Sequence, residues 1–167
     1  APTVKLVVNF TYSVSLDMAI TNWDSDEGNY LYYNQREHEW LSVSPGTFSA
    51  GTGGTCGFTL ESGVENAGRN YLLLGGVTGS TPGYPLPGGQ AVLPVNWDVF
   101  TDLVLAYLNT AIFSDFMGIL DASGSATARL DAPALTPSSV GIVMTYAYVM
   151  NNPFNFTSNP VDVEIVP

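Results

Sequence analysis

Basic residues are scarce in this chain. Its 167 residues hold fifteen acidic residues against four basic ones, Lys5, Arg36, Arg69 and Arg129, for a net charge of −11. A nucleic-acid surface and an anionic membrane surface both need a basic stripe that replaces counterions. Four dispersed bases do not form one, so we expect neither as a partner. Cationic partners, divalent cations and neutral glycans stay open.

Cysteine and histidine occur once each. Cys56 alone can form no intrachain disulfide, and its neighbours are Gly and Thr rather than the basic groups that activate thiols. We expect a buried, structural cysteine. His38, between Glu37 and Glu39, is the only base that a hydrolase triad could use. One Cys and one His do not make a zinc site either. The sequence therefore predicts no catalytic residue, no bound cofactor and no enzyme.

Long apolar runs are missing as well, so no segment is predicted to insert into a membrane. Only 11% of the residues are charged, less than half the usual share, which leaves Ser, Thr, Asn and Gly to cover the surface. Such a surface is common in secreted β-proteins. The chain also begins at Ala1 without a Met, as a processed mature protein does. We expect an extracellular or cell-surface location.

Residues 3–16 carry the clearest strand pattern. Apolar side chains alternate with mostly polar ones over thirteen residues, about twice the usual strand length of roughly 5–6 residues. The residues that we expect to act in assembly are Val4, Leu6, Val8, Phe10 and Tyr12. We hypothesise that this strand is donated to the sheet of a neighbouring copy. The alternative is that it pairs within its own chain, beside residues 30–34.

The segment 17–39 is acidic and aromatic. Asp24, Asp26 and Glu27 alternate oxygen donors around a Gly turn, and such oxygens are the ligands of calcium. The run lacks the full calcium-loop pattern, so a plain acidic hairpin turn competes with a calcium site. The aromatic residues that cluster there are Trp23, Tyr30, Tyr32, Tyr33 and Trp40. Exposed aromatic rings of this kind can stack on a glycan.

From Trp40 onward, short strands recur between Gly, Pro and Ser turns. The predicted strands are 40–44, 55–60, 71–77, 91–95, 126–130, 141–150 and 161–166, with a hairpin that joins 117–120 to 126–130. Apolar residues at 99, 100, 103, 104, 107 and 108 predict one short amphipathic helix, capped by Asp98 or Asn96, and a strand at 103–108 competes with it. We expect the apolar stripe of the helix to be core packing.

This spacing indicates an all-β protein: an antiparallel β-sandwich of the immunoglobulin-like or jelly-roll-like kind, with at most one short helix. We predict an N-terminal strand and hairpin arm in residues 1–39 and the sandwich in residues 40–167.

Several short segments of the sequence match a known kind of module. They include Leu41-Ser-Val-Ser-Pro45, residues 67–75, Leu93-Pro-Val-Asn96 and residues 118–124. In these words the stretch from Leu41 to Pro167 resembles a C-terminal β-sandwich module of uncharacterised secreted proteins of planctomycete-type bacteria. The resemblance implies a fold and secretion, and it implies no functional residues.

Two functions of different classes follow from these observations. The first is an extracellular structural protein, a filament or surface-layer subunit that self-associates into a homopolymer by strand donation from residues 3–16. The second is a secreted carbohydrate- or calcium-dependent binding module that uses residues 17–40. A hydrolase has only the presence of acidic residues in its favour, since two carboxylates suffice for a glycosidase.

Overall fold

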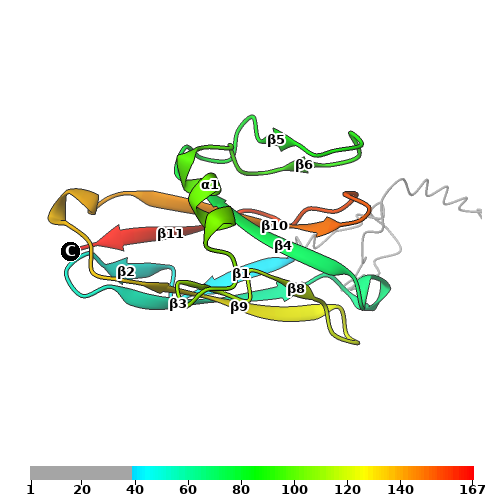
Figure 1. The fold of residues 1–167 in the computed structure, drawn as a ribbon, viewed down its shortest axis with the longest axis horizontal. Coiled ribbons are helices and arrows are strands. Elements are labelled where there is room, and N and C mark those ends of the chain that lie inside the picture. The colour runs from blue at the N-terminus through cyan, green and yellow to red at the C-terminus, as the bar shows by residue number, and fades with distance from the viewer. Residues whose placement is uncertain (1–38) are drawn as a thin grey trace, which may run out of the picture. The chain divides into compact units, whose positions relative to one another are not determined.

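Strands dominate residues 39–167, the part of the chain that this computed structural model describes (Figure 1). In chain order the strands and the α-helix are β1 (Leu41–Ser44), β2 (Thr47–Ser49), β3 (Gly54–Glu61), β4 (Asn70–Gly76), β5 (Tyr84–Pro85), β6 (Val92–Leu93), α1 (Val99–Ala106), β7 (Phe113–Ser114), β8 (Met117–Ile119), β9 (Ser125–Ala132), β10 (Val143–Asn151) and β11 (Val161–Val166). Two 3₁₀ turns, η1 (Val64–Asn66) and η2 (Pro137–Ser139), complete the set.

The strands form two main sheets. Sheet A has the order β1-β3-β9-β7, and sheet B has the order β2-β11-β10-β4-β8. All pairs in these sheets are antiparallel except β2 with β11. Strands β5 and β6 form a separate two-stranded hairpin. The prediction of an all-β, sandwich-like fold with one short α-helix is confirmed.

Side-chain periodicity explains which strands are central. In β3, Cys56, Phe58 and Leu60 are buried while Thr55 and Thr59 between them are exposed, so one face of this strand meets the core. In β10 every residue from Met144 to Met150 is buried. β10 lies between β11 and β4 in sheet B, and β6 also contacts it, so it is the most enclosed strand of this sheet.

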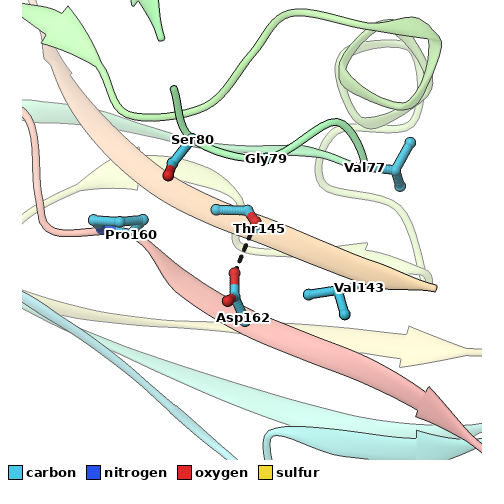
Figure 2. A pocket seen from close by; sticks show the side chains of 7 residues that line it. All are labelled: Val77, Gly79, Ser80, Val143, Thr145, Pro160 and Asp162. Carbon is cyan, nitrogen blue, oxygen red and sulfur yellow. Dashed lines mark hydrogen bonds between the residues drawn. The ribbon is translucent and has the colours of Figure 1, made fainter. Parts of the chain in front are cut away.

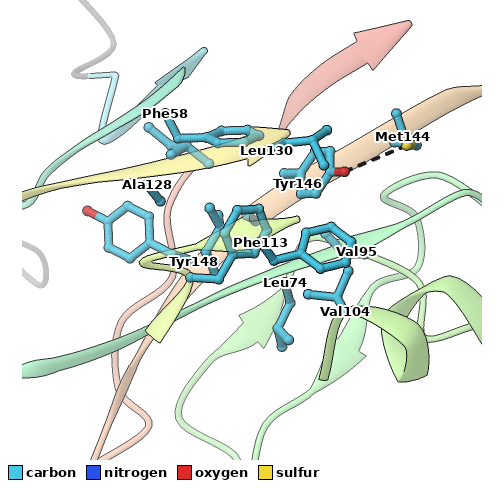
Figure 3. Packing of buried hydrophobic residues seen from close by; sticks show 14 of the residues in the cluster. Phe58, Leu74, Val95, Val104, Phe113, Ala128, Leu130, Met144, Tyr146 and Tyr148 are labelled. Atoms are coloured by element: carbon cyan, nitrogen blue, oxygen red, sulfur yellow. Dashed lines mark hydrogen bonds between the residues drawn. The ribbon is translucent and has the colours of Figure 1, made fainter. Parts of the chain in front are cut away.

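Aromatic rings from both sheets meet in the core (Figure 3). The ring of Phe58 on β3 lies 5.0 Å from that of Tyr146 on β10 and 5.6 Å from that of Phe116. Phe113 of β7 packs against Phe116 at 5.0 Å. The hydroxyl of Tyr146 is buried and donates to Sδ of Met144 at 3.6 Å. These contacts join sheet A to sheet B, since tilted and edge-on ring pairs add to the burial of apolar area.

Helix α1 lies across β4, beside the β5–β6 hairpin (Figure 1). Asp98 is its N-cap: the carboxylate accepts from the main-chain N–H groups of Phe100 and Thr101, and the Thr101 hydroxyl accepts from the N–H of Asp98. This reciprocal pair is a capping box. The predicted helix and the predicted cap at Asp98 are both confirmed, and the competing strand at 103–108 is wrong.

The predicted hairpin at 117–130 is wrong in its pairing. Residues 121–125 do form a tight turn, in which Asp121 N–H donates to Ser125 C=O and Gly124 N–H donates to Asp121 C=O. However, β8 pairs with β4 in sheet B, whereas β9 pairs with β3 and β7 in sheet A. The turn therefore carries the chain from one sheet to the other. The strand expected at 91–95 is shorter than predicted, and β2, β5 and β7 were missed.

Candidate functional site

The residues predicted for calcium and for assembly lie outside the described part of the chain. These are Asp24, Asp26 and Glu27, and the strand residues Val4, Leu6, Val8, Phe10 and Tyr12. His38 and the aromatic residues from Trp23 to Tyr33 lie outside it as well. Their roles stay predictions.

Cys56 lies on β3 with its side chain in the core. The thiol is free and fully buried, and its Sγ approaches the main-chain oxygen of Thr47 at 3.9 Å. Burial raises the pKa of the Cys56 thiol, which disfavours the reactive thiolate. The expectation of a buried, structural cysteine is confirmed.

An open groove of about 310 Å³ lies on the outer face of sheet B (Figure 2). Thr145 and Asp162 face outward there, because the side chains of their neighbours Tyr146 and Val163 point into the core. The hydroxyl of Thr145 donates to Oδ1 of Asp162 at 2.7 Å. The groove is lined by Val77, Gly79, Ser80, Val143, Thr145, Pro160 and Asp162. Its carboxylate and hydroxyl groups could accept hydrogen bonds from a small hydroxylated ligand.

The carboxylate of Asp98 joins α1 to the end of β4. Oδ1 caps the helix, while Oδ2 accepts from the N–H groups of Val77 and Thr78 at 2.8 and 3.0 Å and from Oγ1 of Thr78 at 2.9 Å. Partial burial by itself raises the pKa of Asp98, but the hydrogen bonds from Val77, Thr78, Thr101 and Phe100 outweigh it and hold the pKa below its usual range. The carboxylate of Asp98 therefore stabilises the fold.

The prediction that the whole apolar stripe of α1 packs on the core is wrong for half of its residues. Of the six apolar positions expected to pack on the core, only Phe100, Val104 and Leu108 point inward. Val99, Leu103 and Tyr107 are 81%, 45% and 47% exposed. At about 100° per residue the six positions span an arc of about 180°, and the sandwich covers only half of it. The width of this apolar arc in the sequence could have indicated that part of it stays exposed.

Two asparagine side chains each occupy one main-chain position at the edge of a sheet. The carboxamide of Asn159 accepts from the N–H of Leu41 at 3.0 Å and donates to its C=O at 2.9 Å. Asn109 makes the same pair of bonds to Met117 of β8, at 3.0 and 2.8 Å. Leu41 lies on β1 and Met117 on β8, which are edge strands of sheet A and sheet B as far as the described residues go. Each carboxamide thus occupies the position where a neighbouring strand would bond. Nothing in the sequence pointed to either contact.

Metal ligands and membrane-spanning helices concern residues 39–167 only. Within this range no group of three or more His, Cys, Asp and Glu side chains is placed to hold a metal ion. None of the helices between Glu39 and Pro167 is long and apolar enough to cross a membrane. The likeness to secreted planctomycete-type modules stays a prediction. Compared with models of protein families, with curated proteins and with solved structures, the chain finds no match.

Proposed function

We propose that this chain is an extracellular structural protein whose copies join by donating residues 3–16 to the edge of β1 in a neighbouring copy. The observation that supports the proposal is the state of that edge. Among residues 39–167, the order of sheet A gives β1 a neighbouring strand on one side only. Strand addition needs such an edge, because the added strand binds through its main chain.

The direction of the main-chain groups on β1 follows from its pairing with β3. Glu61 N–H donates to Trp40 C=O, which makes this pair a hydrogen-bonded one. In an antiparallel ladder the bonded pairs alternate, so Ser42 and Ser44 bond to β3 while Leu41 and Val43 turn their N–H and C=O groups outward. Asn159 satisfies Leu41, and the main chain of Val43 bonds to no other residue of the described range on that side.

The donor segment offers main-chain groups and side chains together. Its alternation would place Val4, Leu6, Val8, Phe10 and Tyr12 on one face. Full burial of a large apolar side chain contributes about 1.5–3 kcal/mol, so three or four of them contribute about 4.5–12 kcal/mol, which is comparable with an association cost of about 4–15 kcal/mol. The outward N–H and C=O of Val43 add main-chain bonds to this contribution. Donation from each copy to the next is head-to-tail, which builds a filament unless the rotation closes a ring.

The test compares the intact chain, a chain that lacks residues 1–16, and the variants Val43→Pro and Val43→Ala by analytical ultracentrifugation and negative-stain microscopy. The intact chain should polymerise. A chain that lacks residues 1–16 should stay folded, and its copies should no longer join through β1. A synthetic peptide of residues 3–16 should bind to this shortened chain. Val43→Pro removes the outward N–H without touching the bonds of Ser42 and Ser44 to β3, so it should weaken assembly at least tenfold.

Val43→Ala is the matched control, since it shortens the same partly buried side chain but keeps the N–H. Thermal melts report whether each variant is folded. Assembly that survives the deletion, or a peptide that binds Val43→Pro as well as the intact edge, refutes donation to β1. An intact chain that stays monomeric at high concentration and binds a polysaccharide refutes the structural function in favour of the carbohydrate-binding alternative.

A further inference from the structure

We propose that Asn159 regulates strand addition at β1: its side chain holds the main-chain groups of Leu41, and a strand that binds along the whole of β1 must displace it. We call the two hydrogen bonds between Asn159 and Leu41 the Asn159 contact. The inference rests on the proposed function, because it names the residue that controls how strongly residues 3–16 bind to that edge. The contact is autoinhibitory, since it belongs to the same chain as the edge that it closes.

The Asn159 contact reproduces the bonds that an added strand would make. Oδ1 of the carboxamide accepts from the N–H of Leu41 at 3.0 Å, and Nδ2 donates to the C=O of the same residue at 2.9 Å. The main chain of a neighbouring strand likewise brings one acceptor and one donor to each edge residue that it bonds. Leu41 has a single N–H, so the carboxamide and an added strand compete for it.

Closure at Leu41 halves the edge that β1 offers. Leu41 and Val43 are the two residues of β1 whose N–H and C=O groups point away from β3. They lie two positions apart, about 6.4–6.8 Å in an extended chain, so a strand that bonds to Val43 reaches Leu41 with its next residue but one. With Asn159 in place such a strand bonds to Val43 alone, and with Asn159 displaced it bonds to both.

The main chain around Asn159 is held in place, so the carboxamide can leave Leu41 by rotation of its own side chain. Ser158 is buried, and its N–H donates to the C=O of Tyr148 at 2.9 Å. Its Oγ accepts from the N–H of Tyr148 at 3.0 Å and donates to the C=O of Asn159 at 2.8 Å. The side chain of Asn159 is only partly buried, and Nδ2 also has the C=O of Pro160 within 3.4 Å. A released carboxamide therefore finds water and one local acceptor.

The energetic consequence follows from an exchange of bonds. In wild type, a strand that displaces Asn159 replaces the two hydrogen bonds of the Asn159 contact with two of its own, and the gain is small. In Asn159→Ala the same groups of Leu41 bond to water before the strand arrives, so the strand gains two further bonds. Two net hydrogen bonds correspond to a tightening of at least about fivefold.

The test measures assembly of the full chain by analytical ultracentrifugation at fixed salt. The concentration at the midpoint of assembly should fall at least about fivefold in Asn159→Ala. Asn109→Gly is the matched control, because it removes the corresponding carboxamide from Met117 of β8, and glycine accepts the positive φ of 55° at this position. It should leave the midpoint unchanged. Thermal melts report folding, and Asn159→Ser, which keeps a polar side chain but cannot make both bonds, should shift the midpoint in the same direction.

Hydrogen exchange at the amide of Leu41 gives a second readout, which a loss of stability alone would not reproduce. Below the midpoint of assembly, this amide should exchange faster in Asn159→Ala than in wild type, because its N–H no longer donates to Oδ1. Above the midpoint it should become protected again, because the donated strand takes the place of Asn159. An amide that stays unprotected in the assembled variant overturns the inference.

Failure of this inference differs from failure of the proposed function. If deletion of residues 1–16 abolishes assembly while Asn159→Ala leaves the midpoint unchanged, strand donation stands and the role of Asn159 is wrong. An equal shift in Asn109→Gly also overturns that role, since the carboxamide of Asn109 lies on the other sheet. Assembly that survives the deletion refutes strand donation itself, and the inference falls with it.

Discussion

Asp98→Ala removes the carboxylate that ties the start of α1 to the end of β4. In the native protein this group accepts five hydrogen bonds, two at the helix N-terminus and three from Val77 and Thr78. The variant leaves the helix without its cap. It also removes the shared acceptor that holds residues 77 and 78 against α1.

The expected cost is the sum of two contributions. Loss of an aspartate N-cap costs about 1 kcal/mol. Val77 and Thr78 are exposed, so water can replace part of what they lose, and we count their three bonds together as about 1 kcal/mol. The total of about 2 kcal/mol corresponds to a fall of roughly 8 °C in Tm for a unit of this size. Asp98→Asn is the matched variant: it keeps an oxygen for the cap but loses the second acceptor, and it should cost about half as much.

The dependence on pH has a definite sign. The pKa of Asp98 in the folded protein lies below its ordinary value, so the folded state binds this proton more weakly than the unfolded state does. Its contribution to stability is therefore fully present above an unfolded pKa of about 3.9 and is lost as the pH falls through the folded pKa. Thermal melts at pH 6 and at pH 3, followed by circular dichroism, measure the difference between wild type and Asp98→Asn. A difference that is equally large at pH 3 refutes this reasoning.

Three further predictions follow from single residues. Gly124→Ala should destabilise the fold by more than about 1 kcal/mol, because a Cβ there would lie 1.8 Å from the main-chain oxygen of Gly63; Gly68→Ala, with the same positive φ but open space, should cost less in a urea titration. If the acidic turn holds calcium, chelator lowers the Tm of wild type and not of Asp24→Ala, and an equal response in both removes the calcium site. Cys56 should react with a thiol reagent only after unfolding, and fast labelling of the native chain would contradict its burial.

The fold class could be predicted because strand periodicity and turn residues are local signals. The boundaries of β11 match the predicted 161–166, and β3, β4 and β10 differ from their predicted ranges by one or two residues at each end. Strands of two or three residues, such as β2 and β7, are too short to show a period. They exist because neighbouring strands supply their partners.

The choice of strand partners could not be predicted in the same way. Asp121, Ser123 and Gly124 predict the turn at 121–125, but the strand before the turn belongs to sheet B and the strand after it to sheet A. Which sheet each strand joins is decided by packing of distant residues, such as Met117 beside Leu72 and Ala128 beside Phe58. The contacts of Asn109 and Asn159 could not be predicted for the same reason, since Asn159 bonds to a residue 118 positions away in the sequence.

Strand donation has a geometric consequence that can be tested by itself. Each copy gives one strand and receives another, so the contact is head-to-tail, and it extends a line unless the rotation between copies closes a ring. Within the described residues, β1 offers a donated strand the outward N–H and C=O of Val43, beside the position at Leu41 that Asn159 already occupies. Deletion of residues 1–16 removes the donor and leaves this edge intact, so it should reduce a filament to single copies in analytical ultracentrifugation, and the added peptide of residues 3–16 should bind those copies without joining them.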